Sequence, residues 1–388
     1  MNVAIFIAAL AVVIMIHESG HFLTAKWFDF KATKFFFGFG PTVWSVTRGE
    51  TEYGVKALPL GGFIKIIGMN PYEEVAPEDQ PRSYPNKPRW QRAIVIVAGS
   101  ATHFIVAFLL LWVSAMTIGV QLSEPSTTVD NVTTTLGRAE TPAATLGLRP
   151  GDRVVAVDGR PVDEWPEISS FIKRNAGEEV EFGIQRDGAR VTRSAALGSA
   201  IFDRDGDVVA YAAPGRELRA LRPGESTAGF LGISPSPSYR RLGPIAAVGE
   251  GASTTWEFTV GSVVGIGSVF KQVVDGSLWD ALTTQGPRAI DEAPCGIVCA
   301  TQIAGRSDPY YLVGLIAGFT VFVGLMNLLP LPPLDGGHLA VIGYEAITKR
   351  TIDMRKLIPV AAAVISFFVV LTLAVVYLDL ARPIELPF

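Results

Sequence analysis

Charged residues are absent from long stretches of the chain, and these stretches are strongly apolar. Positions 1–25 contain one charged residue, Glu18, and positions 93–121, 309–334 and 357–378 contain none. A helix of about 20 apolar residues, rising 1.5 Å per residue, crosses a hydrocarbon layer roughly 30 Å thick. The pattern therefore predicts four membrane-spanning helices, which we place at residues 1–27, 93–121, 309–347 and 357–379.

The connections between these helices differ in their content of basic residues, and this difference predicts their sides. Residues 26–92 contain ten Lys and Arg side chains, and residues 348–356 contain four. Cytoplasmic connections of membrane proteins are enriched in Lys and Arg, so the segments 28–92 and 348–356 are predicted to be cytoplasmic. The protein is thus predicted to lie in the cytoplasmic membrane. Its extracytoplasmic parts would be the N-terminus, the long segment 122–308 and the tail 380–388.

Composition narrows the class of protein further. Of the 388 residues, 49% are hydrophobic and 18% are charged, whereas ordinary soluble domains have about 25% charged residues. The net charge is −4, so we expect no nucleic-acid partner. Cys295 and Cys299 are the only cysteines of the sequence, which excludes a disulfide-rich scaffold and a four-cysteine zinc module. A disulfide between them and two buried thiols are both compatible with the sequence.

Turn and strand signals predict a folded α+β domain over residues 122–240. Its elements are, in order, the turn sequence GLRPGD at 147–152, a strand at Arg153–Val157, a hairpin turn at Asp158-Gly159, a helix at 166–175 and a strand at Glu179–Arg186. This order resembles a PDZ domain of the bacterial protease type, which implies a groove that captures chain ends beside a strand. A β-rich spacer that binds no ligand is the alternative.

The remainder of the outside segment, residues 241–308, is predicted to contain an amphipathic helix and a linker. The run Leu242–Val274 is rich in Gly and apolar on one helical face, where Trp256 and Phe270 supply large side chains. Such a helix lies against the membrane surface or against the bundle of spans. Packing in a soluble core is the rival interpretation.

The first predicted span contains the sequence HESGH, an HExxH motif formed by His17, Glu18 and His21. Residues four apart share one face of a helix, so both imidazoles can bind one zinc ion while Glu18 takes a proton from bound water. A polar patch that packs helices together is the alternative. That alternative would leave ionisable groups at membrane depth without a partner, which is costly.

A catalytic zinc needs a third protein ligand and an open position, and the third span offers a candidate. The sequence NLLPLPPLDGGH at 327–338 contains three prolines, so a regular helix cannot continue through it. Irregular backbone at membrane depth is tolerated where protein buries it or where it lines a watery cavity. Asp335, at the end of this break, is the predicted third ligand. A Pro-rich loop at the membrane surface is the alternative, and it leaves the two histidines incomplete.

HESGH in the first span, AG followed by small residues in the second and NLLPLPPLDGG in the third together resemble the site-2 protease family of intramembrane zinc metalloproteases. The bacterial subgroup with an extracytoplasmic PDZ domain, which regulates sigma-factor signalling, fits best. The resemblance implies one zinc ion per chain, bound by His17, His21 and Asp335. It also implies that Glu18 is the general base and acid and that Asn327 hydrogen-bonds the substrate backbone.

The resemblance further implies a membrane-dipping β-hairpin on the cytoplasmic side. Its predicted parts are a strand at Glu52–Ala57, a turn at Pro59-Leu60-Gly61-Gly62 and a strand at Phe63–Ile67. An exposed edge there, with Gly61, Gly62 and Phe63 as substrate-binding residues, would hold an unwound substrate extended at the zinc. A hairpin that only anchors the chain at the membrane interface is the alternative.

The second span departs from the family pattern. Relatives commonly have AGP followed by an Asn four residues after the Gly, whereas this chain has Ala98-Gly99-Ser100 and His103. His103 is a candidate hydrogen-bond partner of a metal ligand, a candidate substrate contact or a polar link between helices, and we favour the link. His338 is expected to pack or to hydrogen-bond just beyond Asp335.

The predicted fold is thus a polytopic α-helical membrane protein with four spans, a membrane-associated β-hairpin and an extracytoplasmic PDZ-like α+β domain. The predicted function is hydrolysis of a peptide bond in single-span membrane proteins within the lipid bilayer, after an upstream site-1 protease has trimmed the same substrate. By resemblance, anti-sigma factors and signal-peptide remnants are the expected substrates. A catalytically idle PDZ scaffold with a structural zinc, and a transporter or metal channel, are the alternatives.

Overall fold

A computed structural model describes residues 1–204, 206, 208–284 and 294–383. The chain divides into two compact units, one formed by Met1–Ile118 with Leu242–Phe388 and the other by Gly119–Arg241. Four helices among the described residues are long and apolar enough to cross a membrane, in agreement with the predicted number of spans. They are α1 (Asn2–Trp27), α2 (Arg89–Thr117), α8 (Pro309–Asn327) and α10 (Ile358–Ala381).

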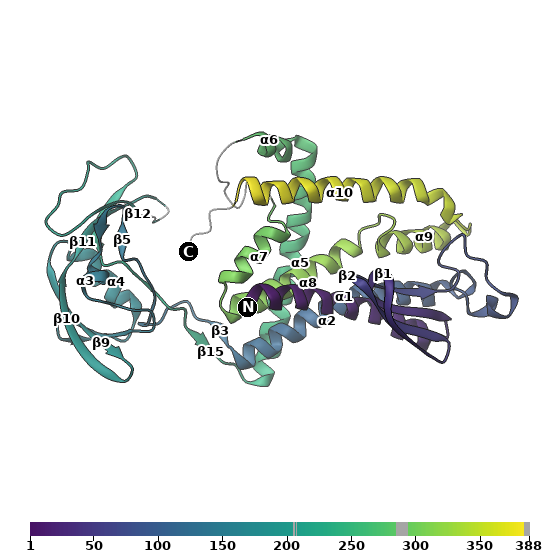
Figure 1. The fold of residues 1–388 in the computed structure, drawn as a ribbon, viewed down its shortest axis with the longest axis horizontal. Helices are drawn as coiled ribbons and strands as arrows, with labels where there is room; N and C mark the ends of the chain where they lie inside the picture. The colour runs from purple at the N-terminus through teal and green to yellow at the C-terminus, as the bar shows by residue number, and fades with distance from the viewer. Residues whose placement is uncertain (205, 207, 285–293, 384–388) are drawn as a thin grey trace. The chain divides into compact units, whose positions relative to one another are not determined.

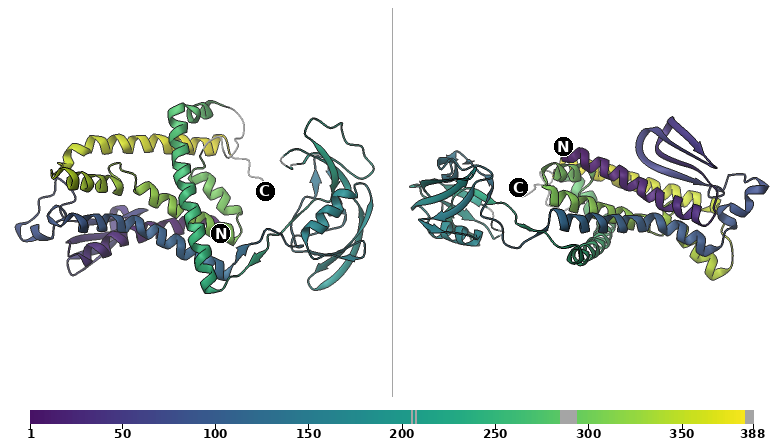
Figure 2. Two further views of the ribbon diagram at one scale, coloured as in Figure 1. Left: turned by 180° about the vertical axis from the view of Figure 1, so that it is seen from behind. Right: turned by 90° about the horizontal axis from the view of Figure 1, so that it is seen from below.

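Within the first unit, α1, α2 and α8 lie side by side and α5 (Pro244–Asp275) crosses them (Figures 1 and 2). Phe258 of α5 packs against Ala107 of α2 and against Ala317 and Val321 of α8. The helix predicted at Leu242–Val274 therefore forms, and it packs on the helical bundle. The next helices are α6 (Ser277–Thr283) and α7 (Ile297–Arg306).

The two cysteines are joined in a disulfide at the start of α7, which decides between the alternatives that the sequence left open. Asp379, near the end of α10, is buried and accepts hydrogen bonds from the backbone N–H groups of Gly296 (3.3 Å) and Cys299 (3.0 Å). These bonds satisfy amides at the helix N-terminus that would otherwise have no partner. The N-terminus of α7 is thereby attached to α10.

The third predicted span consists of two helices. Helix α8 ends at Asn327, and α9 (Asp335–Thr348) begins after the Pro-rich break. A Cβ atom at Gly336 would lie 2.2 Å from the carbonyl oxygens of Leu328 and Leu329, so the start of α9 is folded tightly against the break. Asp335 is the first residue of α9. The helix can begin at this point because the next two residues, Gly336 and Gly337, have no side chains that would clash with the break. A short 3-10 helix (Met354–Leu357) follows α9 and leads into α10.

The sheet on the first unit differs from the predicted hairpin. Strands β1 (Ala32–Arg48) and β2 (Thr51–Ile66) join at Gly49 and Glu50, not at the predicted turn 59–62. Phe36 pairs with Phe63 on one side and with Gly54 on the other, so the segments 52–57 and 63–67 lie on opposite sides of β1. The prediction that these two segments pair with each other was therefore wrong, because the aromatic run of β1 inserts between them.

Ion pairs attach the β1–β2 turn to the rest of the unit. Arg82 donates two hydrogen bonds to the Glu50 carboxylate, at 2.6 and 2.8 Å, and Lys26 at the end of α1 donates a third at 2.5 Å. The hydrogen bonds from Arg82, more than the one from Lys26, lower the pKa of Glu50 to about 2. The network therefore persists above that pH and weakens as the pH falls through it. Arg82 and Tyr84 belong to two short 3-10 helices, Pro77–Arg82 and Tyr84–Asn86.

The second unit contains the predicted β-rich domain. Strand β7 (Arg153–Val157), helix α4 (Trp165–Arg174) and strand β9 (Glu179–Arg186) confirm the predicted elements, and Asp158 and Gly159 form the turn after β7 with positive φ angles. One sheet has the order β10-β9-β7-β8, with β8 at Arg160–Pro161 and β10 at Ala189–Ala196. A second has the order β12-β11-β13, from Val208–Ala212, Gly198–Phe202 and Ser226–Phe230. The smaller elements are β3 (Val120–Gln121), β4 (Val129–Val132), β5 (Thr135–Leu136), β6 (Ala139–Glu140), α3 (Pro142–Thr145), β14 (Ile233–Pro235) and β15 (Tyr239–Arg240).

The turn sequence GLRPGD has a structural role in this unit. Its Asp152 is buried and accepts the backbone N–H of Arg149 at 2.8 Å. Arg186, at the end of β9, donates to both oxygens of the same carboxylate at 2.7 Å, and this guanidinium lowers the pKa of Asp152. The motif therefore fastens the turn before β7 to the adjacent strand.

Candidate metal centre and active site

Three side chains that lie far apart in the sequence meet inside the helical unit. His17 and His21 project from one face of α1, and Asp335 projects from the start of α9. The two Nε2 atoms are 3.1 Å apart, and Asp335 Oδ2 lies 3.3 Å from that of His21 and 3.5 Å from that of His17. Possible ligand atoms of the three residues all lie within 4.8 Å of one another. The HExxH spacing and the Pro-rich break thus bring the predicted ligands together.

The orientation of His21 is fixed by helix α2. Its Nδ1 lies 2.8 Å from the carbonyl oxygen of Val95, which can only accept a hydrogen bond. The proton of the neutral ring therefore sits on Nδ1, and Nε2 directs a lone pair towards His17 and Asp335. Histidine ligands of metals are commonly held in this way by a backbone carbonyl behind the ring.

The convergence of acceptors fits a metal ion. Asp335 Oδ2 is buried and has no hydrogen-bond partner among the described residues. It faces the lone pair of His21 Nε2, and two buried acceptors at 3.3 Å repel each other unless a cation lies between them. Two imidazoles and one carboxylate are a donor set that catalytic zinc sites use, with a further position left for water or substrate.

Glycines allow α1 and α2 to approach each other at this point. A Cβ atom at Gly99 of α2 would lie 2.1 Å from His21 Nε2, and one at Gly20 of α1 would lie 2.5 Å from the carbonyl oxygen of Ala98. A contact under 3.0 Å forces the neighbouring atoms to move. Gly99, which the sequence identified as part of the family-like AGS segment, therefore leaves the room that the His21 ring occupies.

Glu18 lies beside the sheet that the sequence predicted to bind substrate. A Cβ atom at Gly62 of β2 would lie 2.7 Å from Met15 Sδ and 3.4 Å from Glu18 Cγ, so this part of β2 packs directly on α1. Gly61 has a φ of 94°, a conformation that favours glycine. The Phe63 ring stacks against Phe36 with centroids 5.6 Å apart. The segment 61–63 is therefore next to Glu18, although its role in substrate binding stays a prediction.

Three further predicted site residues, His103, His338 and Asn327, lie around the three candidate ligands or on the other side of the Pro-rich break. His103 of α2 is buried, with Nε2 at 3.1 Å from Nδ1 of His17, so it links α2 to α1 through a candidate metal ligand. His338 packs edge-on against Tyr84, with ring centroids 6.4 Å apart. Asn327 is the last residue of α8, on the far side of the break from Asp335, and its contact with substrate stays a prediction.

Sequence reasoning missed a buried ion pair between α2 and α9. Arg92 Nη2 lies 2.5 Å from Glu345 Oε2, and their side chains are only 10% and 7% exposed. Loss of one partner from such a pair costs about 3–5 kcal/mol. The pair holds α9, which begins at Asp335, against the helix that contains Val95. The only signal in the sequence was that Arg92 borders the charge-free stretch 93–121 and that Glu345 lies inside the predicted span 309–347.

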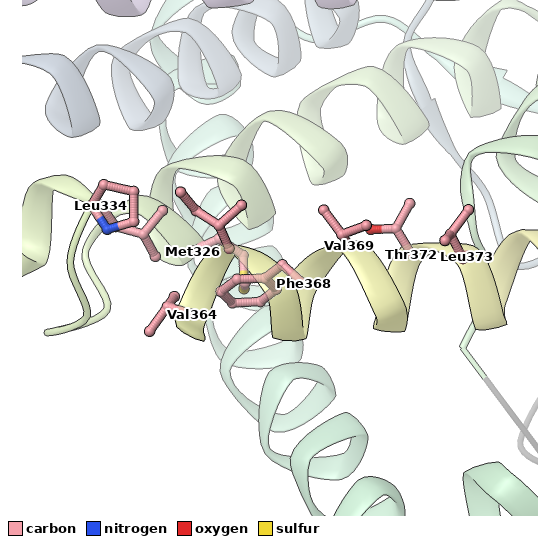
Figure 3. Close-up of a pocket in the computed structure, with 9 residues that line it drawn as sticks. Met326, Leu334, Val364, Phe368, Val369, Thr372 and Leu373 are labelled. Atoms are coloured by element: carbon pink, nitrogen blue, oxygen red, sulfur yellow. The ribbon is translucent and has the colours of Figure 1, made fainter. Parts of the chain in front are cut away.

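An apolar groove with a volume of about 450 Å³ lies between α10 and the Pro-rich break (Figure 3). Met326 and Leu334 form one wall, and Val364, Phe368 and Leu373 of α10 form part of the other. Leu334 immediately precedes Asp335 in the sequence. The groove therefore lies between α10 and the backbone that immediately precedes the third candidate ligand.

Comparison with known proteins decides the family. The model of peptidase family M50 matches residues 5–373, which include every residue of the candidate centre. The chain belongs to peptidase family M50. This is the site-2 protease family that the motifs resemble, so the prediction of a peptidase of this type is confirmed. With its four apolar helices, this M50 peptidase is a multi-pass membrane protein.

Relatives of this M50 peptidase match it from end to end. It is 31% identical to the zinc metalloprotease Rip1 of Mycobacterium bovis, over 99% of this chain and 98% of that protein. It is 30% identical to Rip1 of Mycolicibacterium smegmatis, with the same coverage of both chains.

Among solved structures, the PDZ domain of an SdrC-like protein from Listeria innocua matches 30% of this chain and 99% of its own length, at 17% identity and a TM-score of 0.20. The corresponding domain from Listeria monocytogenes matches 23% of this chain and 86% of its own, at 20% identity and a TM-score of 0.18. TM-scores this low do not establish a shared fold, so the PDZ resemblance of residues 122–240 stays a prediction.

Proposed function

We propose that this M50 peptidase is an intramembrane zinc endopeptidase that cleaves single-span membrane proteins. One observation carries the proposal: His17, His21 and Asp335 converge within 4.8 Å, with Glu18 beside His17 on the same apolar helix. The full-length relatives named zinc metalloproteases support zinc as the metal, and the one group of candidate ligands found among the described residues supports one ion per chain. A structural zinc in an idle scaffold is disfavoured, because structural sites are closed by four protein ligands.

The proposed chemistry assigns one task to each residue. His17, His21 and Asp335 would hold the zinc, which when bound supplies a Lewis acid for the scissile carbonyl and lowers the pKa of water to about 7. Glu18 takes the proton from that water at its carboxylate and later delivers it to the leaving amine. Val95 keeps the proton of His21 on Nδ1, so that Nε2 stays free for the metal.

A peptide bond in a membrane helix is shielded by its own backbone hydrogen bonds, so the substrate must unwind before hydrolysis. We propose that the 61–63 segment of β2 pairs with the unwound substrate, because it lies against Glu18 and Met15. Val43 and Trp44, in the second half of β1, are 69% and 59% exposed. These side chains suit an interfacial anchor. We therefore propose both roles for the sheet: residues 61–63 bind the substrate, and the segment with Val43 and Trp44 anchors the sheet at the membrane interface.

Removal of the metal tests the proposed chemistry. The purified full chain in detergent is incubated with a tagged single-span substrate, before and after treatment with a zinc chelator. We expect cleavage to stop on chelation and to return when zinc is added back in stoichiometric amount. Cleavage that continues in protein shown to contain no zinc would contradict the role assigned to His17, His21 and Asp335.

The substrates and the sidedness are part of the proposal. The Lys and Arg residues in 28–92 and 348–356 support a cytoplasmic sheet, and hence extracytoplasmic termini and an extracytoplasmic PDZ-like unit. We propose that this unit excludes substrates with bulky outside domains until a site-1 protease has trimmed them. Anti-sigma factors and signal-peptide remnants are single-span chains of the kind that such a filter would pass.

Deletion of residues 125–235 tests the filter. We expect the deleted protein to cleave a trimmed substrate at the rate of the full chain and also to cleave the untrimmed substrate, which the full chain rejects. The trimmed substrate serves as the control for an intact catalytic centre. Continued rejection of the untrimmed substrate by the deleted protein would show that the filter lies elsewhere.

A further inference from the structure

His103 occupies a position directly behind a candidate metal ligand. It lies on α2, its side chain is buried, and its Nε2 is 3.1 Å from Nδ1 of His17, with the two ring centroids 5.0 Å apart. The opposite nitrogen of His17, Nε2, faces His21 and Asp335. A single ring thus contacts the candidate centre with one nitrogen and His103 with the other.

Metal binding at Nε2 of His17 would fix which nitrogen of the ring has the proton. A neutral imidazole that offers a lone pair at Nε2 has its proton at Nδ1, and a buried N–H group needs an acceptor. His103 Nε2 lies at hydrogen-bonding distance and can accept this proton, and the backbone of Gly99 is a second hydrogen-bond partner of the ring. The Val95 carbonyl has the same function for His21, from the same helix, about two turns away.

The remaining nitrogen of His103 supports a functional reason for this residue. Its Nδ1 is buried and has no hydrogen-bond partner among the described residues. An unpaired buried polar group is costly, and an apolar side chain of similar size would fill the space without that cost. Packing between α1 and α2 therefore does not account for a histidine at this position.

Helix α8 holds the His103 side chain in place. A Cβ atom at Gly324 would lie 2.7 Å from His103 Cβ and 3.1 Å from its Cγ. Because α8 packs on the Cβ and Cγ atoms of His103, it restricts movement of the ring away from α1. The acceptor is therefore presented to His17 in a defined direction.

We propose that His103 is a positioning residue, which accepts a hydrogen bond from Nδ1 of His17 and thereby orients Nε2 of that ring towards the zinc. The inference rests on the proposed zinc centre and adds a residue that sets its affinity. Removal of a residue that hydrogen-bonds a metal-ligating histidine lowers metal affinity by about 10–100-fold. Helix α2 thus supports both candidate histidine ligands, His21 through Val95 and His17 through His103.

Zinc affinity provides a test that does not depend on catalysis. The full chain and its variants are titrated with zinc in detergent against a chelator of known affinity. We expect His103→Leu to bind zinc about 10–100-fold more weakly than the wild type. His103→Gln, whose side-chain amide reaches the position of Nε2, should retain most of the affinity. Gln91→Leu is the control, because Gln91 Oε1 is a buried, unpaired polar atom on the same helix.

The outcomes separate the inference from the function on which it rests. Wild-type affinity in His103→Leu, or equal losses in His103→Leu and His103→Gln, would overturn the positioning role. A wild type that binds no zinc would instead overturn the proposed function. Circular dichroism of the metal-free proteins checks folding; if His103→Leu does not fold, His103→Ala takes its place as the variant without an acceptor, and the comparison with His103→Gln decides in the same way.

Discussion

Replacement of Glu18 by Gln is expected to lower the rate of substrate cleavage by about 10²–10⁴-fold while zinc remains bound. The amide has nearly the shape of the carboxylate, but it cannot take a proton from water. Glu18 is beside His17 on α1 and its Cγ lies near the backbone of β2, so the substitution leaves packing against Gly62 unchanged. The measurement is the initial rate of cleavage of a tagged single-span substrate, together with the zinc content of each protein.

Glu257→Gln is the matched control for this experiment. Glu257 is an exposed carboxylate on α5, outside the candidate centre, and its replacement should change neither cleavage nor zinc content. Equal cleavage by the wild type and by zinc-loaded Glu18→Gln would mean that another group moves the proton. That result would leave the metal centre in place and remove its assigned base.

Gly99→Ala is expected to damage the centre without removing a polar group. The added methyl carbon would lie 2.1 Å from His21 Nε2, so either the ring or helix α2 must shift by more than 1 Å. Misplacement of a catalytic group by about 1 Å can cost 10²-fold in rate. We therefore expect at least about a 100-fold loss of cleavage and a weaker affinity for zinc, measured by the same chelator competition.

Gly343→Ala makes the same chemical change where there is room for it. Apart from its chain neighbours and the adjacent backbone of α9, no atom lies within 4 Å of a Cβ at Gly343, so this variant should be active and more stable by about 1 kcal/mol. Zinc affinity and cleavage that are unaffected by Gly99→Ala would contradict the close approach of α2 to His21.

The helices and the candidate ligands, which the structure brings together, could be predicted because their signals are local. The spacing of His17 and His21 determines that they share a helical face, whatever the rest of the chain does. The prolines before Asp335 end α8 by their own stereochemistry, and charge depletion marks each span. These features also carry the family resemblance, which the match over residues 5–373 confirms.

The features that sequence reasoning missed depend on distant segments. Phe36 separates two segments of β2 that looked like a hairpin by themselves, and no local turn signal reveals that insertion. The partner of His103 is 86 residues away, and that of Arg92 is 253 residues away. Polar groups at membrane depth do signal that a partner exists. Which partner it is depends on how the helices pack.

Location of the scissile bond tests intramembrane proteolysis most directly. The purified wild type, with zinc-loaded Glu18→Gln as the blank, is incubated with a single-span substrate, and both product ends are identified by mass spectrometry. We expect one new pair of ends inside the apolar span, or at its edge, that is absent from the blank. Ends found only in the soluble parts of the substrate, or the same ends in the blank, would contradict hydrolysis at His17, His21 and Asp335 within the membrane.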